Sequence, residues 1–234
     1  MLYYDKSGIK LHLGDSFKIL QSFPDESFDA IITDPPYGIG YYSNRTYIRI
    51  KERAKRKPTA RGKINIQFAG DQVVSTGWIA EAARVLKTGG AAYIFSRFDV
   101  LPQWSSAVAD HLMIKNVICW VKNKHGTGDL RGAYGGRHEM IIFATKGRHI
   151  PYWPKRETDI WTDYSNEVRV HPTQKPLAVM QHAVINACPP GGRILDPFAG
   201  SGSTLLAARS LGCEGVGIEI DERWAKAAVA RFQS

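Results

Sequence analysis

The sequence predicts an α/β domain built on a doubly wound, mostly parallel sheet, and three observations support that prediction. Short β-rich runs alternate with helical segments along most of the 234 residues, which is typical of parallel strands connected by helices. Two of these runs end at an Asp-Pro pair, Asp34-Pro35 and Asp196-Pro197, where proline cannot continue a strand ladder. No internal repeat or long linker divides the chain, so we expect one domain over residues 1–234.

The expected elements follow in chain order from hydrophobic patterns and turn signals. Strands are expected at residues 9–13, 28–33, 91–95, 113–121, 138–145, 193–195 and 215–220. Helices are expected at residues 15–21, 72–86, 98–110, 177–187, 203–211 and 222–232. Asp15 is a typical N-cap residue for the first helix, and the Lys87-Thr88-Gly89-Gly90 run is expected to end the second. Residues 39–70 have no convincing periodicity, so we predict a long loop insert there.

Positive charge is concentrated in that insert. The chain has 31 Lys and Arg against 22 Asp and Glu, a formal net charge of +9. Almost the whole excess comes from nine basic residues with one acid among them: Arg45, Arg49, Lys51, Arg53, Lys55, Arg56, Lys57, Arg61 and Lys63. A localised basic segment indicates an anionic partner such as nucleic acid. A solvated loop with no defined contact is the alternative.

Several classes of protein and site are not expected. The N-terminus lacks the apolar segment of a secretory signal, and no apolar run is long enough to cross a membrane. Cys119, Cys188 and Cys213 are odd in number and far apart, so we expect buried, reduced thiols in a cytoplasmic protein. The seven histidines form no metal-binding motif, and no metal site is predicted.

The segment DPFAGSGST, residues 196–204, follows one expected strand and opens a helix. Glycines there let a ligand approach the backbone, and a helix N-terminus offers free N–H groups. Glu219 ends the next strand, where an acid suits hydrogen bonds to ribose hydroxyls. The spacing matches neither a dinucleotide fingerprint nor a P-loop, which favours a nucleoside cofactor such as S-adenosylmethionine. A tight turn without a ligand is the alternative.

The segment DPPYG, residues 34–38, also follows an expected strand. The Asp34 carboxylate and the Pro35 carbonyl can together accept both hydrogens of an amino group and orient its lone pair. Tyr37 adds a face on which a planar base can stack. The alternative is a proline-rich turn with an exposed tyrosine.

These motifs and their order resemble the β group of the S-adenosylmethionine-dependent amino-group DNA methyltransferases, and the resemblance covers nearly the whole chain. The matching motifs are GDS at 14–16, DPPYG at 34–38, HPTQKP at 171–176, DPFAGSGST at 196–204 and GIEID at 217–221. The resemblance implies a circularly permuted, Rossmann-like sheet of seven strands. It also implies that strands 28–33 and 193–195 are central neighbours, so that both Asp-Pro motifs meet at one edge.

By the same resemblance, a set of residues would bind the cofactor: Asp15, Ser16, His171, Thr173, Gln174, Lys175, Asp196, Phe198, Gly200, Ser201, Gly202, Ser203, Thr204, Glu219 and Ile220. Lys175 is the best physical candidate for the methionine carboxylate, because a carboxylate needs a cation or donors. Two assignments have structural alternatives. Asp15 can serve as a helix cap, and Ile220, expected on the adenine face, can belong to the core.

Catalysis would be carried out by Asp34, Pro35, Pro36 and Tyr37. Asp34 and the Pro35 carbonyl would accept the hydrogens of an exocyclic amine aligned with the methyl donor, and Tyr37 would stack on the flipped base. We expect adenine as the target, because DPPY is commoner among the adenine enzymes and SPPY among the cytosine-amine enzymes. Cytosine is the main alternative. A silent nucleic-acid-binding relative and an RNA methyltransferase are further alternatives.

The expected partner is double-stranded DNA, contacted by the basic segment and by Lys155 and Arg156. These two residues lie in residues 146–170, the short segment where the family places target recognition, and the glycine-rich loop at 122–137 would supplement it. Aromatic residues in the same segment, such as Trp161, have a small satellite core as their alternative role. The sequence leaves open whether the chain forms a homodimer and whether a restriction nuclease accompanies it.

Overall fold

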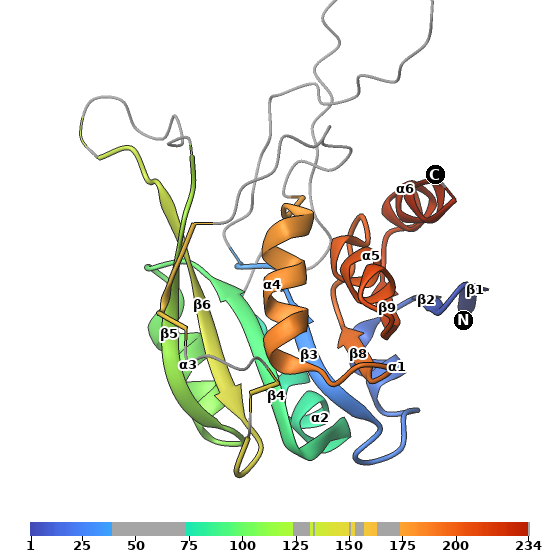
Figure 1. Ribbon diagram of the computed structural model, residues 1–234, viewed down its shortest axis with the longest axis horizontal. Coiled ribbons are helices and arrows are strands. Elements are labelled where there is room, and N and C mark those ends of the chain that lie inside the picture. Colours follow the sequence, from blue (N-terminus) through green and yellow to red (C-terminus); the bar gives the residue numbers. More distant parts are fainter. Residues whose placement is uncertain are drawn as a thin grey trace, which may run out of the picture.

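The computed structural model describes residues 1–38, 74–123, 132, 134–149, 151–152, 157–162 and 174–233. In these ranges the chain forms one nine-stranded sheet with helices on both faces (Figure 1). The strands are β1 (Leu2–Lys6), β2 (Ile9–Leu13), β3 (Phe28–Thr33), β4 (Leu86–Ser96), β5 (Met113–Val121), β6 (His138–Thr145), β7 (Ile160–Trp161), β8 (Arg193–Asp196) and β9 (Glu214–Glu219). The helices are α1 (Ser16–Leu20), α2 (Trp78–Val85), α3 (Leu101–Ala109), α4 (Leu177–Ala187), α5 (Ser203–Ser210) and α6 (Glu222–Phe232).

The strand order across the sheet is β1-β2-β9-β8-β3-β4-β6-β5-β7. From β2 to β4 the neighbouring strands are parallel, whereas β6 is antiparallel to both β4 and β5. The seven expected strands therefore form the sheet from β2 to β5, which confirms the mostly parallel, doubly wound architecture. β1 and the two-residue β7 extend the sheet at its two edges, and the sequence pattern predicts neither of them.

The two strands that precede the Asp-Pro motifs lie side by side at the centre of the sheet. β3 and β8 pair in parallel, with Ala30 opposite Ile194 and Ile31 opposite Leu195. β8 leads through α5 to β9 on one side, and β3 leads to β4 on the other, so the winding reverses between β8 and β3. Open α/β sheets bind ligands at the carboxyl ends of their strands beside such a switch point.

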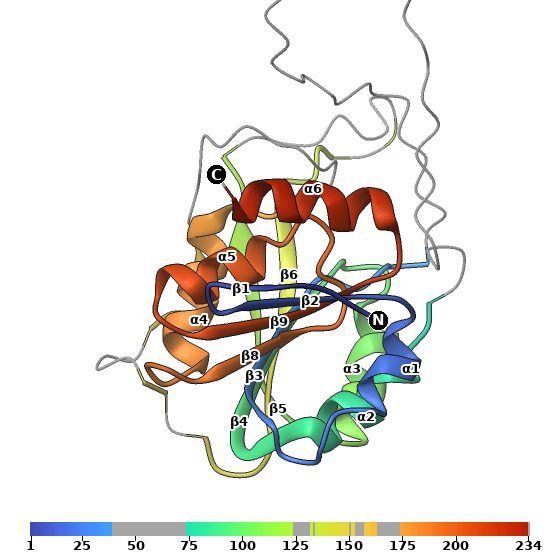
Figure 2. The ribbon, with the colours of Figure 1, turned by 90° about the vertical axis from the view of Figure 1, so that its right-hand side faces the viewer.

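Helices α1 to α3 cover one face of the sheet, and α4 to α6 cover the other (Figure 2). Ile31 and Ile32 are adjacent in β3, and because side chains alternate along a strand, each enters a different core. The first core contains the buried indoles of Trp78 and Trp104, from α2 and α3. The second core lies between the other face of the strands and helices α4 and α5, with Val184 among its buried residues.

Helices α2 and α3 start later than expected. α2 begins at Trp78 rather than at residue 72, and α3 begins at Leu101 rather than at residue 98. Pro102 lies in the first turn of α3, where the missing N–H of proline has no intrahelical partner to lose. The apolar spacing that predicts both helices continues into the preceding turns, so periodicity does not locate their N-termini.

The expected helix stop at residues 87–90 lies inside β4 instead. β4 begins at Leu86, directly after α2. The register against β3 shifts over this stretch, and Gly89 has a φ of +85°. A positive φ of this size suits glycine, and it lets β4 bulge before it continues into the core.

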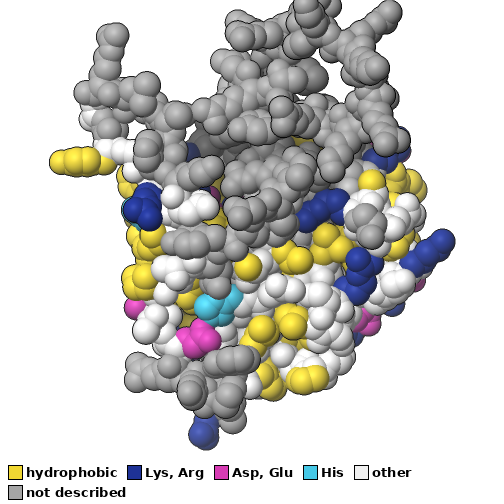
Figure 3. All heavy atoms as spheres, turned by 45° about the horizontal axis from the view of Figure 1, so that its top comes forward, with side chains coloured by type: hydrophobic (Ala, Val, Ile, Leu, Met, Phe, Trp, Pro, Cys, Tyr) yellow, Lys and Arg dark blue, Asp and Glu magenta, His cyan; other side chains and the backbone are white. Residues whose placement is uncertain are grey.

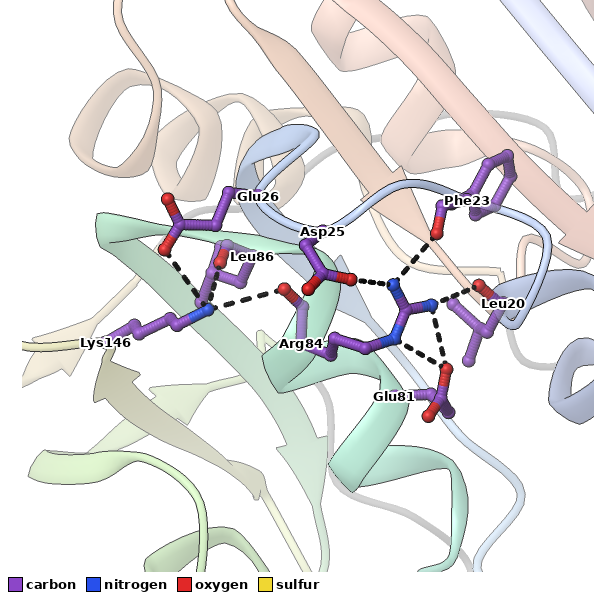
Figure 4. A network of polar contacts seen from close by, with 8 residues as sticks. All are labelled: Leu20, Phe23, Asp25, Glu26, Glu81, Arg84, Leu86 and Lys146. Carbon is purple, nitrogen blue, oxygen red and sulfur yellow. Dashed lines mark hydrogen bonds and ion pairs between the residues drawn. The ribbon is translucent and has the colours of Figure 1, made fainter.

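Arg84 holds together the edge of the sheet opposite the Asp-Pro motifs (Figure 4). Its guanidinium, at the end of α2, donates to the carbonyls of Leu20 at 3.0 Å and Phe23 at 2.9 Å. It also donates to the carboxylates of Glu81 and Asp25. These bonds connect α2 to the chain segment between α1 and β3.

Lys146 extends the same network from the end of β6 (Figure 4). Its ammonium donates to the Leu86 carbonyl at 2.8 Å and to the Arg84 carbonyl at 3.3 Å. It pairs with the Glu26 carboxylate at 3.5 Å. Because backbone carbonyls accept most of these bonds, the network fixes the relative positions of chain segments.

Three further findings concern the described ranges only. None of their helices is both long and apolar enough to cross a membrane. No group of three or more His, Cys, Asp or Glu side chains in them is arranged to hold a metal ion. Cys188 and Cys213 are buried and Cys119 is partly buried, and all three are free thiols.

Candidate active site

Three acidic residues stand at the carboxyl ends of adjacent parallel strands. Asp34 follows β3, Asp196 ends β8 and Glu219 ends β9. These strands are neighbours, so the acids occupy one edge of the sheet, the upper edge in Figure 1. The fold therefore brings together the two Asp-Pro motifs and the acid at the end of β9.

The Asp34 carboxylate is held from two sides. The Tyr37 hydroxyl donates to Oδ1 of Asp34 at 2.5 Å, and the Lys175 ammonium donates to Oδ2 at 2.5 Å. Pro35 is buried, and the two prolines end β3 because they cannot supply ladder N–H groups. The Asp34 side chain is 18% exposed, so part of its surface can be reached from outside.

Lys175 lies between two carboxylates. Its Nζ atom is 3.1 Å from Oε2 of Glu139, the second residue of β6, and its side chain is only 7% exposed. The other oxygen of Glu139 pairs with Lys122, which follows β5. The resemblance places Lys175 at the cofactor carboxylate, whereas in this structure its ammonium contacts Asp34 and Glu139.

Burial and neighbouring charges set the protonation of this group of side chains. Burial, together with Glu139, raises the pKa of Asp34, although the Lys175 ammonium opposes that shift. Burial and the Asp34 carboxylate raise the pKa of Tyr37, so the phenol keeps the proton that it donates. Burial also favours the neutral form of Glu139, but Lys175 and Lys122 outweigh it and lower the pKa of Glu139.

Asp196 connects the two central strands. Its Oδ1 atom accepts hydrogen bonds from the Thr33 hydroxyl at 2.7 Å and from the Phe198 N–H at 3.1 Å. Thr33 is the last residue of β3, so this carboxylate fixes the DPPYG loop relative to the DPFAGSGST loop. Burial raises the pKa of Asp196 to about 6, against the opposing effect of hydrogen bonds from Thr204 and Thr33.

The glycine-rich loop is held from behind by α6. The Arg231 guanidinium donates to the Ser201 carbonyl at 2.6 Å and reaches the Ser201 and Ser203 hydroxyls at 3.2 Å. Gly202 has a φ of +77°, and a Cβ atom there would lie 2.5 Å from the Phe232 ring. Packing against α6 therefore requires glycine at position 202. The reason expected for this glycine from the sequence is the approach of a ligand to the backbone.

Glu219 bridges the loop and the start of α6. Its two oxygens accept from the N–H groups of Gly200 and Asp221, both at 2.8 Å. Burial raises the pKa of Glu219 to about 7, although these backbone bonds oppose the shift. The next residue, Ile220, is 52% exposed, which excludes the alternative that it belongs to the core.

Asp15 and Ser16 bring α1 to the same loop. The Asp15 carboxylate accepts from the Phe17 N–H at 2.9 Å and is the N-cap of α1, as one of its two expected roles requires. The Ser16 hydroxyl donates to the Pro197 carbonyl at 2.5 Å. The GDS motif therefore touches the DPFAGSGST loop directly.

Several predicted site residues lie outside the described part of the chain. They are His171, Thr173, Lys155, Arg156 and the nine basic residues from Arg45 to Lys63. Gln174 is described and buried. On the face drawn in Figure 3, the described Lys and Arg side chains stand singly or in small groups.

The described part of the expected recognition segment, residues 146–170, is divided between two places. His149 contacts the Gly89 carbonyl at 2.7 Å, near the beginning of β4 and away from Asp34. Trp161 is 3% exposed and stacks on His182 of α4, with ring centroids 4.1 Å apart. Trp161 therefore has a structural role, but it belongs to the second main core of the sheet and not to a small satellite core.

The arrangement around β8 and β9 fits a nucleoside cofactor. The Glu219 carboxylate accepts backbone hydrogen bonds from Gly200 and Asp221, and a carboxylate has about four acceptor positions, which leaves capacity for a ribose hydroxyl. The exposed side chain of Ile220 offers an apolar surface for a base beside that carboxylate. Gly200, with a φ of +51°, leaves backbone free of a side chain at the loop.

Glu139 and Lys122 are the residues that sequence reasoning misses at this edge. Neither belongs to a recognisable motif, and each lies far from Asp34 in the chain. Glu139 is an acid near the start of a strand whose following residues are apolar, and this pattern could have marked it as unusual. The pattern does not show that Glu139 contacts Lys175.

Comparisons with known proteins agree with this geometry. Residues 28–230 match the family N6_N4_Mtase, described as DNA methylase. The chain is 29% identical to the type II methyltransferase M.ScaI of Streptomyces caespitosus over 278 residues, covering 99% of this chain and 84% of M.ScaI. The solved M1.HpyAVI–SAM complex is similar with a TM-score of 0.70 and 25% identity, covering 95% of this chain and 99% of that one.

The cytosine-N4-specific PvuII DNA methyltransferase has the same fold, with a TM-score of 0.70 at 15% identity, covering 96% of this chain and 86% of that one. These likenesses confirm the resemblance to the S-adenosylmethionine-dependent amino-group DNA methyltransferases. The family match alone spans most of the chain. The chain therefore belongs to the N6/N4 DNA methylase family.

Proposed function

We propose that the chain transfers a methyl group from S-adenosylmethionine to the N6 amine of adenine in double-stranded DNA. The observation that supports this proposal best is the Asp34 carboxylate at the end of β3, beside the strand that leads into the glycine-rich loop. In this family an aspartate there is commoner among adenine enzymes than among cytosine enzymes. The fold is shared with a cytosine-N4 enzyme, so the choice of adenine rests on this motif.

Asp34 and the Pro35 carbonyl are the proposed acceptors for the target amine. Tyr37 and Lys175 each use one lone pair of the Asp34 carboxylate, which leaves acceptor capacity on both oxygens. S-adenosylmethionine supplies an electrophilic methyl group when bound. Positive charge grows on the amine during the transfer, and a carboxylate fixed beside it stabilises that charge. The same acceptors orient the amine lone pair.

Tyr37 is the proposed stacking surface for the flipped base. Extracting a base from the duplex costs a few kcal/mol, and stacking on an aromatic ring returns about 1–3 kcal/mol. The hydrogen bond from the Tyr37 hydroxyl to Asp34 fixes the position of the ring relative to the acceptor. One residue thus relates the place where the base stacks to the place where its amine binds.

The cofactor is proposed to bind along the ends of β8 and β9. Glu219 would accept from the ribose hydroxyls, and Ile220 would pack on the adenine of the cofactor. Asp196 and the loop that follows it would shape the methionine end, with Gln174, Lys175, His171 and Thr173 near the carboxylate. Asp15 and Ser16 would lie beside the adenine amine, in addition to their structural bonds.

DNA is the substrate class of the family, and the contact residues are proposed from charge. The nine basic residues from Arg45 to Lys63 begin seven positions after Gly38 in the chain. Phosphate contacts there would position the duplex without reading its sequence. Lys155 and Arg156 are proposed as further contacts. A DNA substrate also favours a cytoplasmic location.

A methyl-transfer assay tests the proposal. Labelled S-adenosylmethionine, purified chain and unmethylated genomic DNA are incubated with and without competing RNA, and the nucleosides are separated. We expect label in N6-methyladenine, with little competition by RNA. Label in N4-methylcytosine supports the cytosine alternative. Preferential labelling of RNA, or binding of the cofactor without transfer, would reject the proposal.

A further inference from the structure

Asp34 belongs to a chain of alternating charges that extends away from the site. In order, the polar groups are Tyr37, Asp34, Lys175, Glu139 and Lys122. The two carboxylates and the two ammonium groups balance in formal charge. Glu139 is not among the groups proposed to contact the target base, so its contact with Lys175 needs a separate explanation.

Lys175 is shared unequally between its two carboxylates. Its ammonium is 2.5 Å from Asp34 and 3.1 Å from Glu139, and it also lies 5.0 Å from the centre of the buried Phe95 ring. In these surroundings water does not screen the charges well, so each carboxylate weakens the hold of the ammonium on the other. At the other end of this chain of charges, Lys122 forms an ion pair with Glu139 and so weakens the attraction between Glu139 and Lys175.

We propose that Glu139 is a positioning residue for methyl transfer, because it draws Lys175 partly away from Asp34 and so keeps Asp34 a strong acceptor for the target amine. This inference rests on the proposed function. A carboxylate fully neutralised by one ammonium accepts a further hydrogen bond weakly. A carboxylate without any cation in a buried site takes up a proton instead. Sharing Lys175 between two carboxylates places Asp34 between these two limits.

Other charged groups also face this part of the site from the neighbouring elements. Asp196, at the end of β8, is affected by the charge of Asp34. Arg97, which follows β4, acts on Tyr37. Neither is altered by a substitution at Glu139, so both belong to the constant background of the test.

The test is the pH dependence of single-turnover methyl transfer, with saturating DNA and S-adenosylmethionine. In Glu139→Gln the neutral amide forms no ion pair with the ammonium, so Lys175 forms its ion pair with Asp34 alone. We expect the rate on the plateau to fall about tenfold and the midpoint of the acidic limb to move to lower pH. Lys122→Met frees Glu139 to bind Lys175 more strongly, so its midpoint should move to higher pH.

Two controls separate positioning from a merely structural role. Glu139→Asp keeps the negative charge and should keep a midpoint near that of the wild type. Glu222→Gln removes an exposed carboxylate that pairs with Lys226 within α6, and it should change neither the rate nor the midpoint. Thermal unfolding of every variant is measured in parallel, and Lys122→Met alone decides the sign if Glu139→Gln does not fold.

The outcomes are distinguishable from failure of the proposed function. A wild-type chain that transfers no methyl group to DNA rejects that function, and with it this inference. An active wild type whose midpoint does not move in folded Glu139→Gln or Lys122→Met overturns this inference alone. Shifts in opposite directions in the two variants support it.

Discussion

The sheet has one edge at the carboxyl ends of its parallel strands and an opposite edge at their amino ends. Each of these two edges carries a network of charged side chains, and the networks differ in their acceptors. At the edge drawn in Figure 4, Arg84 and Lys146 direct much of their bonding to backbone carbonyls. At the opposite edge, the Lys175 ammonium contacts two side-chain carboxylates, those of Asp34 and Glu139. A cation on carbonyls fixes the path of the chain, whereas a cation on carboxylates sets their charge.

Solvent exposure differs in the same direction. The Asp25 carboxylate that pairs with Arg84 is 75% exposed, whereas the Asp34 side chain is 18% exposed. Ion pairs between exposed groups contribute little free energy, because water screens them. Buried charges interact strongly and shift one another's pKa values. We infer that the Arg84 network contributes to stability, and we propose the Asp34 edge as the place of the chemistry.

Substitution of Asp34 should lower the rate of methyl transfer more than any other change considered below. Asp34→Ala removes the proposed acceptor for the target amine, so methyl transfer should fall about 10³-fold or more. Binding of S-adenosylmethionine, measured by calorimetry, should stay close to that of the wild type. Asp110→Ala, at the exposed C-cap of α3, is the matched control. Near-normal turnover by Asp34→Ala would contradict the chemical role of this edge.

The Arg84 edge should show the reverse pattern. Arg84→Ala leaves the carbonyls of Leu20 and Phe23 without these hydrogen bonds, so the free energy of unfolding in urea should drop by about 2 kcal/mol. The rate of methyl transfer, measured where the variant is folded, should be unchanged. The control is Lys226→Ala, which removes one exposed ion pair in α6. A large loss of the methyl-transfer rate without a loss of stability would contradict the structural role of Arg84.

Tyr37 allows the Asp34 edge to be divided further. Tyr37→Phe keeps the ring but removes the hydroxyl that bonds Asp34, so the single-turnover rate should fall about tenfold. Tyr37→Ala also removes the stacking surface and should lower the rate further, with the fold retained in circular dichroism. Equal rates for the phenylalanine variant and the wild type would show that the hydroxyl does not orient the acceptor.

A further prediction concerns the pH dependence of stability. Burial raises the pKa of Glu219 from 4.5 to about 7 in the folded chain. Between these values the folded state binds more protons than the unfolded state, so the contribution of Glu219 to stability falls as pH rises through this window. Glu219→Gln should therefore flatten the decrease in unfolding free energy between about pH 4.5 and 7. An identical slope in the variant would contradict the buried state of this carboxyl.

Much of the fold could be predicted because its signals are local. The bounds of β3 and α4 match the expectation, since prolines or an unbroken apolar pattern mark their ends. β1 and β7 could not be predicted in the same way. β7 has two residues and exists only because β5 offers a free edge beside Cys119 and Trp120.

The site divides in the same manner. Asp34, Asp196 and Glu219 stand in motifs at strand ends, so parallel strands bring them to one edge. Glu139 and Lys175 meet only because β6 runs antiparallel to β4 and returns its first residues to that edge. Gly202 is a glycine because of Phe232, which closes against it from the last helix. No local pattern in the sequence contains either relationship.

We propose that the residues at the carboxyl end of β3, with Asp34 as the acceptor, carry out the methylation of adenine in DNA. Mass spectrometry of nucleosides tests it most directly, on DNA from cells that express the wild-type chain or Asp34→Ala at equal levels. We expect N6-methyladenine in DNA from cells with the wild-type chain. With the variant, we expect only the amount of N6-methyladenine that untransformed cells contain. Equal amounts of N6-methyladenine with both chains, or a wild-type chain that adds only another methylated base, would contradict it.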